Sequence, residues 1–239
     1  MPTRACYVIG IGAIAQQTLE QIITHLGDAY GALEDMQASE WLALSFDVAE
    51  QALIPPAKTD GLHFQQVCLD DALRADWLGS GRADLGLTEH WVTLNLGRRW
   101  SARQINRRRQ LMRLVFLHRL VTAPEALLRP IGDALSRLQA QQLSTVDVHF
   151  VGSLGDVEMS AWYLDLANLV RYAAHKRGLS TRLLLHTALP MATVDPTDRN
   201  EFQRRQIDSF AFWQELAHFD TPDEIAAHPL YPAYMTPLV

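Results

Sequence analysis

The sequence predicts an α/β protein with a doubly wound, mostly parallel sheet, and three observations support this fold class. Short apolar runs alternate with helix-like stretches along most of the chain, the order typical of a parallel sheet with crossover helices. The first apolar run leads through a glycine-containing turn directly into a helix-like stretch. The 239 residues are 48% hydrophobic and 20% charged, which excludes a disordered, collagenous or disulfide-stapled protein. We expect one domain spanning residues 1–239.

Each predicted strand is a short apolar run bounded by turn-forming or polar residues. We expect strands at 5–9, 41–46, 63–69, 145–151 and 181–189. The third run is the weakest of the five. The fourth alternates apolar and polar residues as a strand does, and Pro190 closes the fifth.

The predicted helices are stretches whose apolar residues share one face. We expect them at about 14–25, 111–120, 131–143, 158–177 and 200–219. In the first of these, Leu19, Ile22 and Ile23 fall on one side. Pro130 is expected to separate the second helix from the third, because proline has no amide proton to donate. Gly178 is expected to end the fourth.

Charge is unevenly distributed along the chain. The net charge of −6 argues against general nucleic-acid binding. Arginine supplies 19 of the 21 basic residues, and eight of these arginines fall within 98–119. Since arginine pairs in a planar, multi-donor fashion with carboxylates and phosphates, this segment predicts a docking surface for an acidic protein partner. Nucleic acid is the lesser alternative, and a merely solvated helix face is the other interpretation. The candidate docking residues are Arg98, Arg99, Arg103, Arg107, Arg108, Arg109 and Arg113.

The cellular compartment is predicted from three features. No apolar run approaches the ~18 residues of a membrane span. The N-terminal residues lack the pattern of a signal peptide. Cys6 and Cys68 lie in strand-like apolar runs and are expected to be buried, reduced thiols. We therefore expect a cytoplasmic protein.

Two kinds of catalytic or metal site are not expected. The nine histidines show no metal-ligand spacing, and His118, His149 and His186 are interpreted as core residues. Ser153 lies in a stretch that lacks one residue of the G-x-S-x-G nucleophile elbow, so no catalytic serine is expected either.

In parallel sheets, ligands bind at the turns that follow the carboxyl ends of the strands. The first such turn contains Gly10, Gly12 and Ala15, which satisfy the dinucleotide pattern G-x-G-x-x-A. In proteins with that pattern, an acid that binds the ribose follows ~20 residues later. Here the acid at the end of the second predicted strand is Asp47, which lies well beyond this spacing. An NAD-binding Rossmann protein with Asp47 on the ribose remains an alternative.

A succession of motifs resembles the tubulin/FtsZ superfamily. YVIGIG, a helix and then LALSFDVAEQAL resemble the family's opening, with 46–53 similar to the FtsZ stretch Asn-Thr-Asp-Ala-Gln-Ala-Leu. TVDVHFVGSLGD followed by a helix is similar to the strand and signature loop, and LSTRLLLHTALP to the next strand. The segments 108–118 and 204–216 resemble a bacterial tubulin-like branch in particular.

The resemblance implies where a nucleotide would bind. The cofactor that the resemblance makes possible is GTP with Mg²⁺. Glu201 and Arg205 fall where members of the family carry an acid and an arginine that face the ribose and the base. The positions implied to line the site are Gly10, Gly12, Ala13, Gln16, Asp47, Gly152, Ser153, Gly155, Asp156, Glu201 and Arg205.

The departures from the family point away from nucleotide binding. The signature loop is GGGTGTG-like, but here Leu154 adds bulk, and Asp156 and Glu158 add negative charge where phosphate should approach a helix N-terminus. Two unit charges ~4 Å apart repel by ~4 kcal/mol at an effective dielectric of ~20, although a bridging Mg²⁺ would reverse that sign. The family's second domain, which supplies the acid that triggers hydrolysis, is expected to be absent.

The sequence therefore predicts a degenerate tubulin/FtsZ-like protein. We expect it to act as a binding or scaffold subunit of a bacterial multi-protein assembly, with no catalytic residues, no required cofactor and weak or lost nucleotide binding. A GTP-binding protein with slow or partner-activated hydrolysis is the alternative. The aromatic residues of the last helix follow helical spacing only in part, so any that are exposed would mark a protein interface.

Overall fold

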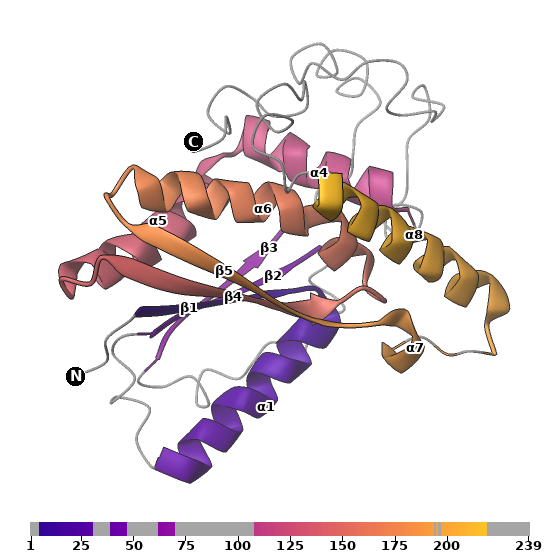
Figure 1. Ribbon diagram of the computed structural model, residues 1–239, viewed down its shortest axis with the longest axis horizontal. Coiled ribbons are helices and arrows are strands. Elements are labelled where there is room, and N and C mark those ends of the chain that lie inside the picture. The colour runs from indigo at the N-terminus through magenta and orange to yellow at the C-terminus, as the bar shows by residue number, and fades with distance from the viewer. Residues whose placement is uncertain are drawn as a thin grey trace.

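A five-stranded, all-parallel sheet forms the centre of the protein (Figure 1). The computed structural model describes residues 5–30, 39–46, 62–69, 108–193, 195 and 197–218. The strands are β1 (Ala5–Ile11), β2 (Ser39–Ser45), β3 (His63–Cys68), β4 (Thr145–Ser153) and β5 (Ser180–Ala188), and their spatial order is β3-β2-β1-β4-β5. The predicted doubly wound parallel α/β fold is confirmed.

Helices lie on both faces of the sheet (Figure 1). Of the described helices, α1 (Ala13–Tyr30) covers one face, while α4 (Arg109–Thr122), α5 (Glu125–Ala140) and α6 (Val157–His175) cover the other. The chain moves outward from β1 in one direction and from β4 in the opposite direction. Because such crossovers are right-handed, α1 and α6 fall on opposite faces. After the short α7 (Pro190–Thr193), α8 (Arg199–His218) packs against α6.

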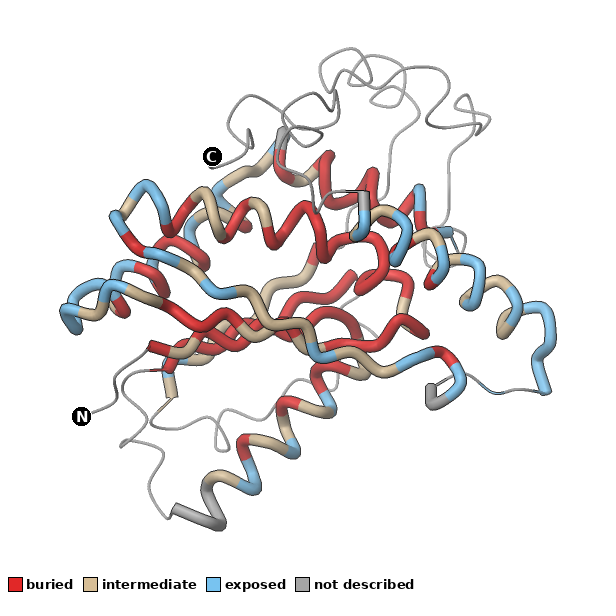
Figure 2. Tube along the Cα trace, viewed as in Figure 1, coloured by how far each residue is buried: buried red, intermediate tan, exposed pale blue. Residues whose placement is uncertain are grey.

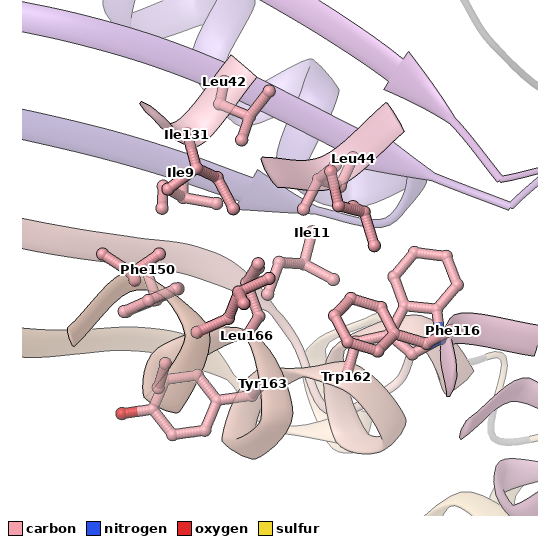
Figure 3. Close-up of a cluster of buried hydrophobic side chains, with 14 of the residues drawn as sticks. Ile9, Ile11, Leu42, Leu44, Phe116, Ile131, Phe150, Trp162, Tyr163 and Leu166 are labelled. Atoms are coloured by element: carbon pink, nitrogen blue, oxygen red, sulfur yellow. The ribbon is translucent and has the colours of Figure 1, made fainter. Parts of the chain in front are cut away.

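The larger hydrophobic core lies between the sheet and α4, α5 and α6 (Figure 3). Ile9, Ile11 and Leu44 from the strands face Phe116 and Trp162 from the helices, and all are buried. Figure 2 shows the buried positions gathered on the inner strands and on the helices that pack against them. The indole Nε1 of Trp162 donates a 2.8 Å hydrogen bond to a backbone oxygen of α4, so α4 and α6 are joined by a polar contact inside the core. A smaller cluster seals α1 against the other face.

Most predicted elements agree with the observed ones within a few residues, but Pro130 does not separate two helices. It lies inside α5, and the break falls at Ala123 and Pro124 instead. The two cysteines are free thiols of intermediate burial, so Cys6 and Cys68 are less buried than predicted. Across the described part of the chain, no helix combines the length and apolarity that crossing a bilayer requires.

Candidate functional site

The candidate site lies at the carboxyl ends of β1 and β4, where the order of the strands reverses. Parallel α/β sheets bind ligands at this point, in the crevice between the two turns. Ile11 is paired with Gly152, so the turn at Gly12 and the loop 153–156 leave the sheet side by side. Gly12 has a φ of 88°, a conformation that residues with a Cβ rarely adopt. The structure therefore brings together the two glycine-containing turns that the sequence singled out.

The loop 153–156 uses its backbone amides within the chain. The amide of Leu154 donates to the carbonyl oxygen of Ala188 at 2.8 Å, and the amide of Asp156 donates to that of Ser153 at 2.9 Å. The amide of Gly155 donates to Ser153 Oγ at 2.9 Å. A phosphate-binding loop directs such amides at its ligand. Here three successive amides already have acceptors, and the fully buried Ser153 hydroxyl closes the turn instead of facing a ligand.

The carboxylate of Asp156 lies at the N-terminus of α1. Its Oδ2 accepts a 3.1 Å hydrogen bond from the amide of Ile14. A Cβ placed on Gly12 would lie only 2.8 Å from the same oxygen. The first turn of a helix is an anion site, because its amides have no partner within the helix and the helix dipole favours negative charge. Asp156 therefore supplies, from 142 residues away in sequence, the anion that this helix end accepts.

The other glycines of the pattern have a packing explanation. A Cβ on Gly10 would lie 2.6 Å from Leu19 Cδ1 of α1. A Cβ on Gly152 would lie 2.6 Å from Met159 Sδ of α6 and 3.0 Å from the carbonyl oxygen of Ile11. At Gly10 the contacting atom is the end of the flexible Leu19 side chain, which would have to shift to admit a Cβ. At Gly152 the backbone oxygen of Ile11 is also close, so tight packing between helix and sheet favours glycine there whether or not a ligand binds.

Two predicted site residues and one further acidic residue lie in the first turns of the helices that follow these two loops. Ala13 and Gln16 are in the first turn of α1, and Gln16 is almost fully buried. Within the part of the chain that the structure describes, the Nε2 of Gln16 has no hydrogen-bond partner. Glu158, in the first turn of α6, is also buried. Asp47 lies outside the described residues, so its contact with a ribose stays a prediction.

Glu201 and Arg205 are on α8 and form an ion pair with each other at 2.8 Å. One turn further on, Ser209 Oγ lies 2.8 Å from the carbonyl oxygen of Arg205 and 3.4 Å from that of Leu154. α8 therefore reaches the 153–156 loop, and the role of Glu201 and Arg205 toward a ribose and base stays a prediction. Burial raises the pKa of Asp208 in this region, against the opposing effect of Arg205 and nearby arginines.

Two of the predicted docking arginines are used inside the protein. Arg113 Nε donates to Asp165 Oδ2 at 2.7 Å, and both side chains are under 5% exposed. Arg109 makes two hydrogen bonds to Glu215, at 2.8 and 2.6 Å. The docking prediction is thereby corrected for these two residues, because their guanidinium groups join α4 to α6 and α8. Arg108 is exposed, and Arg98, Arg99, Arg103 and Arg107 lie outside the described residues.

Two histidines assigned to the core lie instead on the opposite face of the sheet. Val148 and Phe150 point into the larger core, so His149 between them points away from it. His149 Nδ1 is 2.9 Å from His186 Nε2 on β5, with ring centroids 5.2 Å apart and planes 8° apart. The rings therefore lie nearly in line, joined by one N–H···N bond. Burial, and secondly the charge of His186, lower the pKa of His149.

The contact between the two histidines could not be predicted, because the sequence alone does not show that β4 and β5 are neighbours in the sheet. Among the described residues, no group of three or more histidine, cysteine or acidic side chains is arranged to hold a metal ion.

The fold is that of a Rossmann-like, parallel α/β protein with strand order 3-2-1-4-5. No protein-family model matches the chain, and no curated protein matches it.

Proposed function

We propose that the protein is a degenerate tubulin/FtsZ-like protein that acts as a binding or scaffold subunit of a bacterial assembly and has no GTPase activity of its own. The observation that carries this proposal is the Asp156 carboxylate on the Ile14 amide at the N-terminus of α1. A nucleotide would need its phosphates at that helix end and would meet a negative charge there. The occupied amides of the 153–156 loop support the same conclusion.

The binding role is supported by exposed apolar side chains near the carboxyl ends of the strands. Large exposed hydrophobic residues are concentrated on α8 and on the segment that leads into it. They are Leu189, Met191, Ile207, Phe210 and Trp213. Exposed aromatic residues of the last helix were expected to mark a protein interface, and exposed apolar groups of this kind are typical of one.

Isothermal titration of the purified protein with GTP and Mg²⁺ tests the proposal. We expect no heat of binding up to millimolar nucleotide, and no nucleotide among the small molecules released on denaturation, as measured by mass spectrometry. Micromolar affinity that Gly12→Val abolishes would contradict the proposal. Ala140→Val is the matched control, because Ala140 is exposed at the end of α5 and belongs to neither of the two turns.

One observation favours the second candidate, a GTP-binding protein with partner-activated hydrolysis. None of the described residues offers an acceptor to the buried Nε2 of Gln16, in the first turn of α1, and a phosphate oxygen would supply one. The same titration separates the two candidates. Binding that is lost in Gln16→Leu but kept in Gln17→Leu, at the exposed neighbour, would favour the second.

A further inference from the structure

His149 and His186 hold two imidazole nitrogens close together on adjacent strands. Among the described strands, β5 lies at the edge of the sheet, beside β4 (Figure 1). The two strands are paired along their whole lengths, with His186 opposite Val151, two residues beyond His149. This register fixes the spacing of the rings, and His149 Nδ1 lies 2.9 Å from His186 Nε2. His186 is exposed and His149 is half-buried, so solvent reaches the pair.

The distance between the two nitrogens is also the distance between neighbouring ligands of a metal ion. Neutral imidazole is the commonest metal ligand of proteins and binds through either ring nitrogen. Such nitrogens bind a metal such as Zn²⁺ at ~2.0–2.1 Å, so two of them lie about 2.9 Å apart at a right angle and about 3.4 Å apart at the tetrahedral angle. The observed 2.9 Å matches the right-angled arrangement, which is the one that square-planar Cu²⁺ and Ni²⁺ adopt.

Metal binding at this pair requires movement of the rings but not of the strands. The ring planes are 8° apart and the centroids 5.2 Å apart, so the two nitrogens point at each other along one line. A metal bound to both nitrogens sits beside that line, which requires each ring to turn by roughly 45° toward a common point. The χ2 torsion of histidine is broad and allows such a turn. The proton shared by the rings then moves to the outer nitrogen of the ring that donated it, and no proton is released.

The charged groups beside the histidines neutralise each other. Asp147 lies two residues before His149, and Arg182 lies four residues before His186, so all four side chains are on the same side of the sheet. Arg182 donates two hydrogen bonds to the Asp147 carboxylate, at 3.0 and 2.6 Å. Because the carboxylate offsets the guanidinium charge, the arginine presents little net repulsion to a cation at the histidines.

We propose that His149 and His186 form a binding site for a divalent transition metal of the Cu²⁺ and Ni²⁺ class, with water in the remaining coordination positions. Hard cations such as Mg²⁺ prefer oxygen ligands and are not expected to bind there. A metal on both rings ties β5 to β4, so it stabilises the folded chain by mass action. The inference is independent of the proposed function, because neither histidine belongs to the turn at Gly12 or to the loop 153–156.

Isothermal titration with Ni²⁺ at pH ~7.5, where imidazole is neutral, tests the site. Ni²⁺ is the chosen probe because, unlike Cu²⁺, it does not oxidise the free thiols of Cys6 and Cys68. We expect binding that is at least ~10-fold weaker in His149→Gln and in His186→Gln, because one imidazole alone cannot chelate. The double variant should bind no more weakly than either single variant. His175→Gln, at an exposed histidine near the end of α6, is the matched control and should bind as the parent does.

Thermal unfolding tests the link between the metal and the fold. Saturating Ni²⁺ should raise the Tm of the parent and of His175→Gln, and Mg²⁺ should raise neither. His186→Gln, which changes an exposed side chain, should keep the parent's circular dichroism spectrum and lose the rise in Tm. Equal Ni²⁺ affinity in the parent and either single variant, losses that add in the double variant, or a parent Tm that Ni²⁺ does not raise would each overturn the proposal. No nucleotide takes part, so such a failure would leave the argument about the phosphate site untouched.

Discussion

Replacing Asp156 by alanine is the most direct test of the role assigned to its carboxylate. This side chain accepts the hydrogen bond from the Ile14 amide and places a negative charge at the start of α1. If the carboxylate acts as a built-in anion for this helix end, its removal should destabilise the fold. If the position were instead kept open for a phosphate, the carboxylate would be a liability, and its removal should stabilise the fold.

The expected loss follows from the contact itself. Removing a side-chain acceptor from a helix N-terminus costs about 0.5–2 kcal/mol, and the interaction of a charge with the helix dipole contributes ~0.3–1 kcal/mol. The two contributions overlap, so we expect the free energy of unfolding to fall by ~1–2 kcal/mol. For a chain of this length each kcal/mol shifts Tm by ~2–4 °C, which gives a fall of about 2–8 °C.

Thermal and urea unfolding of Asp156→Ala, followed by circular dichroism, measure the effect. Asp156→Asn is the control, because it keeps an oxygen acceptor and removes only the charge. It should lose roughly half as much as the alanine variant. An alanine variant as stable as the parent, or more stable, would refute the assignment of the carboxylate as a structural anion.

Three further predictions concern the buried pair, the glycine turn and the histidine pair. Arg113→Met leaves Asp165 buried without its partner and should cost ~3–5 kcal/mol in urea unfolding, with much of the loss recovered when Asp165→Leu is added; a cost below ~1 kcal/mol would contradict this. Gly12→Ala combines a positive φ with a Cβ pressed on Asp156, so it should cost more than ~1 kcal/mol and less when combined with Asp156→Ala, as a double-mutant cycle would measure. Because the pKa of His149 is lowered in the folded chain, the unfolded chain takes up a proton on this histidine at a higher pH, near 6.5, and stability should decline below that pH. Urea unfolding from pH ~7 to ~5 should show a shallower decline of stability in His149→Gln than in the parent. An equal decline in the two proteins would contradict the prediction.

The fold was predictable because its signals are local. The run 145–151 alternates and Pro190 ends the last strand, and these properties need only neighbouring residues. Pro130 shows the limit of such reasoning. Its missing amide is tolerated inside α5, whose face buries Ile131 and Leu135 among other residues, so packing outweighs the local signal.

The candidate site was predictable only in part, because it depends on which strands are adjacent. Asp156 and Glu158 were expected to add negative charge at the N-terminus of the helix that follows them. Asp156 instead serves α1, and this partner emerges only when β1 and β4 are paired. His149 and His186 meet for the same reason, across two strands. Arg109 and Arg113 were predicted to form part of a docking surface. Their acidic partners, on α6 and α8, lie far away in the sequence, so the sequence alone did not show that these arginines pair inside the protein.

The bond between Asp156 and Ile14 also has a kinetic consequence. It closes a contact over 142 residues, linking the β1–α1 unit to the β4–α6 unit. Such a contact gains nothing until both units have formed and docked, so it should be absent from the folding transition state. Its loss would then leave the rate of folding nearly unchanged and accelerate unfolding. By this argument, the residue that fills the helix end also determines how long the folded chain survives before it opens.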